Sequence, residues 1–176
     1  MNLPNSITLA RIALAPVFVW VLLLNQAPGV WQRWIVVALF VLAIATDGVD
    51  GAIARKRGQV TELGKLLDPI ADKVLIGGAL VTLSALGQID WWITIVIMVR
   101  EIGITVYRLA VIKDRVIPAS GGGKLKTILQ SIVIGLYLSP LAGAFETIGI
   151  FQLVLLYVVL AITVISGIQY LMAARK

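Results

Sequence analysis

Long apolar segments alternate with short polar connections along the whole chain. Six segments are apolar throughout, near residues 7–24, 34–56, 64–86, 91–112, 124–141 and 147–172, and the connections NQAPGVWQR, LGQID and SPLAGAFE are predicted loops. A strand of a membrane barrel alternates apolar and polar residues, so these segments indicate helices. Each has about the 20 residues that a helix needs to cross a hydrocarbon core about 30 Å thick. The pattern predicts an all-α fold, a single domain over residues 1–176 that forms an integral membrane bundle of six transmembrane helices.

The composition supports a membrane protein. Hydrophobic residues make up 60% of the chain and charged residues 14%, and the mean hydropathy is +0.99. Soluble domains carry about 25% charged residues. The first apolar segment contains Arg11, has no basic region before it and has no small-residue cleavage site. We therefore interpret it as the first membrane helix and not as a cleaved signal.

The basic residues predict an orientation in the membrane. They gather in two loops and at the C-terminus, whereas Arg33 stands alone at the other side; the clustered residues are Arg55, Lys56, Arg57, Lys113, Arg115, Lys124, Lys126, Arg175 and Lys176. By the positive-inside rule both termini and these loops are cytoplasmic. The net charge of +6 then reflects topology and attraction to anionic membrane lipids, so no nucleic-acid partner is expected.

Cysteine and histidine are both absent. This excludes disulfides, thiolate metal sites and thiol nucleophiles. It also removes the commonest general base, so proton transfer must depend on carboxylates or on metal-bound water.

Acidic residues nevertheless occur inside the second and third apolar segments. Asp47 and Asp50 share one helical stripe with Gly51 and Ala54, and Asp68 and Asp72 share another with Gly64. The two helices are predicted to form a hairpin, which would bring four carboxylates together near the cytoplasmic side. Such a group of like charges is relieved by a hard divalent cation such as Mg²⁺, Mn²⁺ or Ca²⁺, and two ions about 4 Å apart can clamp a phosphoryl group.

An alternative interpretation is simple ion pairing at a helix end near water. The available cations are Arg55, Lys65 and Lys73. For any single aspartate both interpretations stay open, because charges at helix ends can reach the interface. Four aspartates at these spacings favour the metal site.

Residues 47–72 read D-x-x-D-G-x-x-A-R, eight residues, and G-x-x-x-D-x-x-x-D. This resembles the signature of the CDP-alcohol phosphotransferases, and all eight fixed positions are present: Asp47, Asp50, Gly51, Ala54, Arg55, Gly64, Asp68 and Asp72. The resemblance implies a six-helix membrane enzyme, usually a homodimer, that transfers a phosphate-bearing group from a CDP-linked donor to an alcohol and releases CMP. It implies that Asp47, Asp50, Asp68 and Asp72 bind Mg²⁺ or Mn²⁺, with two ions per site. Asp72 would also be the general base.

The first apolar segment begins with PNSITLAR. It resembles the PNxxTxxR sequence of the family's bacterial phospholipid synthases. By this analogy the donor, CDP-diacylglycerol, is bound by Asn5, Arg11, Asp50, Gly51, Ala54, Arg55 and Gly64. Helix capping explains the stretch from Asn5 to Thr8 nearly as well, because Asn or Ser before an apolar segment is what a helix cap requires.

A basic pocket is predicted for the acceptor. Arg100, Glu101 and Arg108 lie inside the fourth apolar segment, and Lys124 and Lys126 follow the loop IPASGGG. Glu101 and Arg108, seven residues apart, share a face and are predicted to neutralise each other, whereas Arg100 has no evident partner. Arg100, Arg108, Lys124 and Lys126 together suit an acceptor that carries a phosphate. Topology alone also explains each lysine taken singly.

Three further segments resemble a subgroup of the family. DP-x-A-D-K, R-E and G-K-x-K-T occur in this order, as in the members that use CDP-diacylglycerol and glycerol 3-phosphate at the cytoplasmic face of the bacterial plasma membrane. The alternatives are the same chemistry with inositol phosphate, serine or a phospholipid as the acceptor, and a cation transporter whose acidic residues line an ion path.

Overall fold

The computed structural model describes the backbone of residues 3–24, 30–56, 62–111 and 121–174, and the side chains of residues 8–24, 30–46, 67, 69–107, 125–141 and 143–172. Over these residues the secondary structure is entirely helical, which confirms that the fold is all-α. The elements are α1 (Leu3–Leu24), α2 (Val30–Lys56), α3 (Glu62–Ala85), α4 (Trp91–Val111), α5 (Gly121–Leu138), α6 (Leu141–Ala144) and α7 (Glu146–Ala174). Six of them are long and correspond to the six apolar segments.

The structure corrects two details of the predicted boundaries. Helix α2 begins at Val30, so part of the predicted first loop is helical. The predicted loop SPLAGAFE contains the four-residue helix α6. Ser139 Oγ accepts a hydrogen bond of 3.4 Å from the Leu141 amide, and Pro140 fixes its own φ at −78° at the N-cap. These local constraints nucleate a short turn where hydropathy alone predicts a loop.

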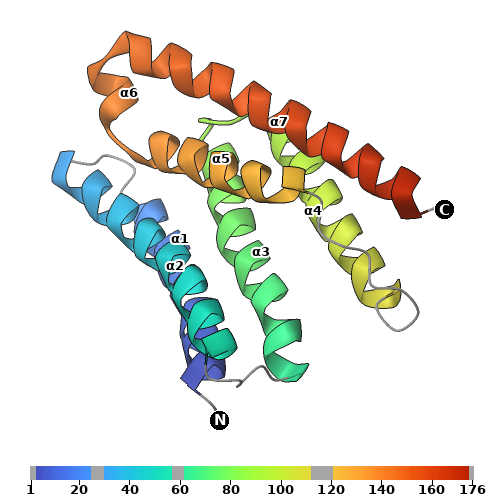
Figure 1. Cartoon of the computed structure of the whole chain (residues 1–176). Helices are drawn as coiled ribbons and strands as arrows, with labels where there is room; N and C mark the ends of the chain where they lie inside the picture. Colours follow the sequence, from blue (N-terminus) through green and yellow to red (C-terminus); the bar gives the residue numbers. More distant parts are fainter. Residues whose placement is uncertain (1–2, 25–29, 57–61, 112–120, 175–176) are drawn as a thin grey trace.

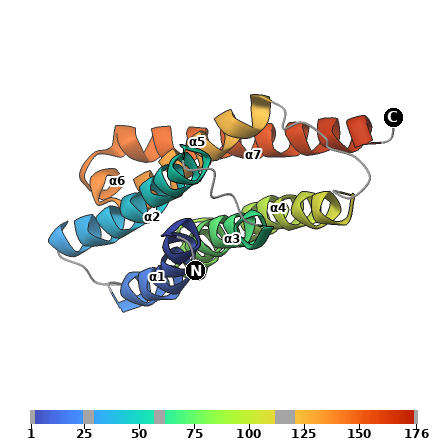
Figure 2. The same ribbon diagram turned by 60° about the horizontal axis from the view of Figure 1, so that its bottom comes forward.

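The long helices form two layers. Figure 2 shows α1, α3 and α4 side by side in one layer and α2, α5 and α7 in the other. Helix α3 contacts α1 and α4 within its layer and α2 and α5 across it. In Figure 1 helix α6 lies at the upper left, together with the end of α1 and the beginning of α2. The beginning of α1 and the end of α2 lie at the bottom. The central position of α3 brings the residues that it carries close to four other long helices.

The packed interior lies between the layers. Phe18 of α1 and Phe40 of α2 are fully buried, with ring centroids 5.7 Å apart. Leu80, Ile97 and Ile134 extend this core through α3, α4 and α5. In lipid, helices associate through close packing because the hydrophobic effect does not distinguish a neighbouring helix from an acyl chain. The interlocking core therefore fixes the relative positions of the helices.

The exterior is strongly apolar. Exposed large apolar side chains occur on every long helix, whereas a soluble monomer rarely exposes extensive apolar patches. Among the described residues, Glu146–Met172 is the segment long and apolar enough to cross a membrane by itself, with a mean hydropathy of 2.7. Thr8–Leu24, Val30–Thr46 and Leu125–Leu138 are shorter apolar helical segments.

The tryptophans mark one end of the molecule. All five of them lie near the end of α1, in the first turns of α2 or at the start of α4, and all are exposed: Trp20, Trp31, Trp34, Trp91 and Trp92. Tryptophan favours the interface between hydrocarbon and water. This end is therefore suited to one of the two membrane surfaces.

Candidate active site

The described part of the predicted site begins with two adjacent residues of α3. Lys73 Nζ donates to Asp72 Oδ2 at 2.9 Å and lies 2.9 Å from Glu101 Oε2 of α4. The Asp72 side chain is 34% exposed, so a substrate hydroxyl has access to its carboxylate. The Asp72–Lys73 pair is the ion pairing that the alternative interpretation expects for a single aspartate.

Glu101 is the centre of the cluster. It is only 5% exposed. Its Oε1 accepts a hydrogen bond of 2.9 Å from Arg100 Nη1 and another from Lys126 Nζ of α5. With Lys73 on Oε2, cations from three helices surround one carboxylate. A buried carboxylate is tolerated only with such partners.

Helix α7 holds the far side of Arg100. Arg100 Nη2 donates to Ser166 Oγ at 2.9 Å, and Ser166 Oγ donates to the Thr163 carbonyl at 3.1 Å. A Cβ atom on Gly167 would lie 3.1 Å from Arg100 Cγ, so the stem of the arginine runs closely past this glycine. We call the six residues Asp72, Lys73, Arg100, Glu101, Lys126 and Ser166 the Glu101 cluster.

The cluster unites three of the residues predicted from the sequence, namely Asp72, Arg100 and Lys126. The expectation that Arg100 lacks a partner is wrong, because Glu101 and Ser166 both bind it. Glu101 was expected to neutralise Arg108, whose side chain lies outside the described residues. Its observed partners are Lys73, Arg100 and Lys126.

The remaining predicted residues are described less fully. Ten of them are described by their backbone alone: Asn5, Asp47, Asp50, Gly51, Ala54, Arg55, Gly64, Asp68, Arg108 and Lys124. The described side chains alone contain no group of three or more acidic residues, so the four-aspartate metal site stays a prediction. Helices α2 and α3 do contact each other, as the predicted hairpin requires. A set of carboxylate oxygens without histidine or cysteine fits a hard divalent cation.

Two polar residues of the PNSITLAR sequence, Thr8 and Arg11, have described side chains in α1. Thr8 is 1% exposed and Arg11 is 3% exposed. Helix α1 packs against α2 and α3, the helices that carry the predicted aspartates. A buried arginine inside an apolar helix is costly and usually serves a function, so the burial of Arg11 is compatible with its predicted place in the donor site.

An open apolar groove lies beside the cluster, between α3 and α4. Its volume is about 530 Å³, and its walls include Ile70 and Val74 of α3 and Met98 and Ile102 of α4. Lys73 also lines it. A polar cluster and an apolar groove thus meet at one residue.

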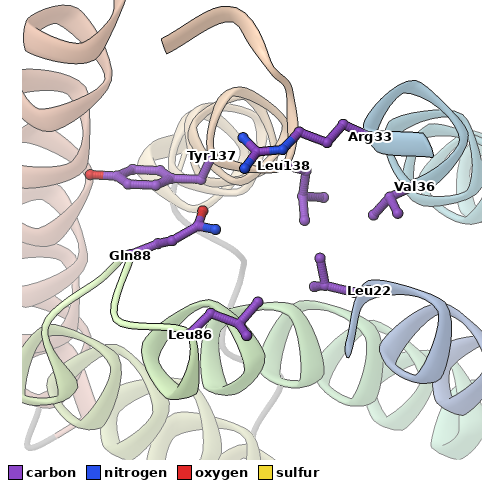
Figure 3. A pocket seen from close by; sticks show the side chains of 7 residues that line it. All are labelled: Leu22, Arg33, Val36, Leu86, Gln88, Tyr137 and Leu138. Atoms are coloured by element: carbon purple, nitrogen blue, oxygen red, sulfur yellow. The ribbon is translucent and has the colours of Figure 1, made fainter. Parts of the chain in front are cut away.

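A second cavity, of about 140 Å³, lies at the other end of the bundle (Figure 3). The side chains of Arg33 from α2 and Gln88 from the α3–α4 connection face it, and Leu86 closes one side. Leu86 comes 14 residues after Asp72, which is about 21 Å along a helix. None of the described residues that line this cavity is acidic, and this distance separates it from the candidate active site.

Four residues of the cluster or its surroundings were not among the predicted metal-binding, donor-binding or acceptor-binding residues. Lys73 directly follows Asp72, and Glu101 directly follows Arg100. Their charges inside apolar segments could therefore have indicated that they belong to the site. Ser166 and Gly167 lie in α7, the helix that contains the membrane-length apolar segment Glu146–Met172. Small residues are common in membrane helices, so nothing in the local sequence connects these two with Arg100.

Comparison with known proteins gives a consistent assignment. The family profile described as CDP-alcohol phosphatidyltransferase matches residues 1–165. A Mycobacterium tuberculosis protein named "Probable phosphatidylglycerophosphate synthase" is 45% identical over 175 residues, covering 99% of this chain and 82% of the relative. Proteins named CDP-diacylglycerol--glycerol-3-phosphate 3-phosphatidyltransferase are similar too. The one from Bacillus subtilis is 41% identical, covering 96% of this chain and 93% of the relative. The one from Yersinia enterocolitica is 38% identical, covering 100% and 96%.

The matches extend over nearly the whole chain and include the aspartate signature at residues 47–72. The chain therefore belongs to the CDP-alcohol phosphatidyltransferase family of enzymes.

Proposed function

We propose that this enzyme transfers the phosphatidyl group of CDP-diacylglycerol to glycerol 3-phosphate. The acceptor hydroxyl attacks the phosphorus next to the diacylglycerol, the pyrophosphate bond to CMP breaks, and CMP leaves with the bridging oxygen. The product is phosphatidylglycerol phosphate. The observation that carries this proposal is the Glu101 cluster, which joins the accessible carboxylate of Asp72 to Arg100 and Lys126 through Lys73 and Glu101. The names of the Bacillus and Yersinia relatives describe the same reaction.

Asp72 is proposed to accept the proton of the acceptor hydroxyl. Its partial exposure gives the hydroxyl access, and Lys73 orients one carboxylate oxygen at 2.9 Å. A positioned carboxylate can serve as a general base in a chain without histidine.

The donor's polar part is assigned to the residues of the family signature. Asp47, Asp50, Asp68 and Asp72 would hold Mg²⁺ or Mn²⁺, which when bound neutralises pyrophosphate oxygens and stabilises the leaving CMP. Asn5, Arg11, Gly51, Ala54, Arg55 and Gly64 are proposed to bind the cytidine and phosphates. The apolar groove between α3 and α4, which reaches Lys73, is proposed to take an acyl chain of the donor.

The acceptor's phosphate is assigned to Arg100 and Lys126, together with Arg108 and Lys124. Arginine offers paired donors to phosphate oxygens and lysine adds a point charge. Lys73, Arg100 and Lys126 give the cluster three cations against the two carboxylates of Asp72 and Glu101. The excess positive charge favours a phosphate-bearing acceptor over serine.

We further propose that the chain crosses the bacterial plasma membrane six times, with both termini and the active site at the cytoplasmic face, and that it forms a homodimer. The charge and tryptophan distributions support the orientation. The Glu101 cluster lies toward one end, whereas the five tryptophans and Arg33 lie toward the other. Contact with membrane lipids follows from the apolar exterior.

The test is CMP release by the purified protein in detergent with CDP-diacylglycerol and Mg²⁺. Glycerol 3-phosphate, inositol phosphate and serine are compared as acceptors. We expect release with glycerol 3-phosphate and its loss with EDTA. Release only with another acceptor would reassign the acceptor site, and no release with any acceptor would favour the cation-transporter alternative.

A further inference from the structure

The two oxygens of the Glu101 carboxylate serve two different groups. Oε2 lies 2.9 Å from Lys73 Nζ, which is itself 2.9 Å from Asp72 Oδ2. Oε1 binds Arg100 Nη1 at 2.9 Å and also binds Lys126 Nζ. One side of the carboxylate therefore faces the proposed base, and the other faces the proposed phosphate-binding cations.

This carboxylate is firmly placed. The Glu101 side chain is 6% exposed and that of Lys126 is 4% exposed. Its partners come from α3, α4 and α5, and Arg100 is also tied to Ser166 of α7. The arrangement consequently depends on four helices that the core holds in register.

Neutralisation alone does not explain the arrangement. A single cation neutralises the unit charge of a carboxylate, and neutral hydrogen-bond donors can satisfy its remaining lone pairs, whereas Glu101 contacts three cations. Gathering three cations around one acceptor costs repulsion among them, so a function for their spacing is expected.

The acceptor supplies a reason for such spacing. Glycerol 3-phosphate carries its reacting hydroxyl and its phosphate on the same small molecule. When cations hold the phosphate, the hydroxyl reaches the base only if the base stands at a matching distance. A misplacement of about 1 Å can lower a rate by about 10²-fold.

We infer that Glu101 is a positioning residue that sets the distance between Asp72 and the acceptor-phosphate cations Arg100 and Lys126, and thereby selects the length of the acceptor. This inference rests on the proposed function. Glu101 itself does not touch the acceptor in this assignment; it acts through Lys73 on one side and through Arg100 and Lys126 on the other.

The experiment uses acceptors of graded length with the full-length enzyme. CMP release is measured with 2-hydroxyethyl, 3-hydroxypropyl and 4-hydroxybutyl phosphate, and with glycerol 3-phosphate. The principal variant is Glu101→Asp, which keeps the charge but draws the carboxylate back by about 1.5 Å. We expect the wild type to prefer the three-carbon acceptor. In the variant, the ratio of kcat/KM for the three-carbon acceptor to that for the other lengths should fall by about tenfold.

A second variant, Glu101→Gln, keeps the shape but offers one oxygen, so either Lys73 or the Arg100 and Lys126 pair loses its acceptor. It is expected to flatten the length preference as well. Thr94→Val is the matched control, because it removes a buried 2.7 Å hydrogen bond to Ser84 between α3 and α4 outside the cluster. Its length preference should equal that of the wild type. Thermal unfolding in detergent verifies that each variant is folded.

The outcomes are distinguishable. Three results would overturn the positioning role while leaving the proposed function intact. They are an equal fall of kcat/KM for all acceptors in both Glu101 variants, an unchanged length preference in both, and loss of folded protein in both. If the wild type releases no CMP with glycerol 3-phosphate, the proposed function fails and the inference fails with it. Release with glycerol 3-phosphate but without any preference among the three hydroxyalkyl phosphates would overturn the length selection alone.

Discussion

At the scale of the single residue, Asp72 combines two properties that a general base requires. Its carboxylate is partly exposed, and Lys73 holds one oxygen in a fixed place. Asp72→Asn keeps the size of the side chain but removes its basicity. We expect turnover to fall by about 10²- to 10⁴-fold while binding of CDP-diacylglycerol is largely retained. CMP-release kinetics together with a donor-binding titration would measure both effects, and near-normal turnover would exclude Asp72 as the base.

The same residues show how far sequence reasoning reaches. Asp72 was predicted because its spacing from Asp68 and from residues 47–55 matches a family signature, and Arg100 and Lys126 because charges are conspicuous in apolar segments. Glu101 was paired with Arg108 from helical periodicity, which sees only neighbours on one helix. Its observed partners Lys73 and Lys126 come from other helices, so their approach depends on tertiary packing. The contact of Arg100 with Ser166, 66 residues away, is of the same kind.

At the scale of the element, the six long helices were predictable because each is a long apolar segment between polar breaks. Their arrangement in two layers was not predictable, since lipid-exposed helices are apolar on outer and inner faces alike and periodicity does not separate the two. Helix α6 was missed because four residues are too few for a hydropathy signal. The packing of α7 against α4 is the part of this arrangement that bears most directly on the site.

Substitution of Gly167 tests the packing of α7 against α4. Alanine there would place a Cβ atom 3.1 Å from Arg100 Cγ, so the arginine stem must move while Glu101 and Ser166 hold its guanidinium. Because small displacements of binding groups weaken substrate positioning, we expect Gly167→Ala to raise the KM for glycerol 3-phosphate by about threefold or more and to leave the donor KM unchanged. Gly135→Ala in α5 is the matched control, because nothing lies within 4 Å of its added carbon. The KM for glycerol 3-phosphate is measured by steady-state kinetics in both variants. Equal values in Gly167→Ala and Gly135→Ala would mean that α7 does not set the position of Arg100.

At the scale of the whole molecule, the cluster and the tryptophan-rich end suit opposite membrane surfaces. The cluster joins α3, α4, α5 and α7 on one side of the core, and the second cavity with Arg33 and Gln88 lies at the other end. A donor with acyl chains keeps them in lipid while its pyrophosphate lies at the interface. An active site near one end of the bundle therefore allows the lipid and the water-soluble acceptor to meet without either crossing the membrane.

The orientation can be tested with unusual clarity because the chain contains no cysteine. A single thiol introduced by Gln88→Cys lies at the tryptophan-rich end, and one introduced by Gln59→Cys lies in the predicted cytoplasmic loop after the aspartates Asp47 and Asp50. Since basic loops stay cytoplasmic, a membrane-impermeant maleimide should label the Gln88→Cys variant in intact spheroplasts and the Gln59→Cys variant only after the membrane is opened. Labelling of the cysteine-free parent measures the background. The reverse labelling pattern would place the aspartates at the outer face, where the released CMP would be lost from the cell. It would therefore contradict both the proposed topology and the proposed cytoplasmic active site.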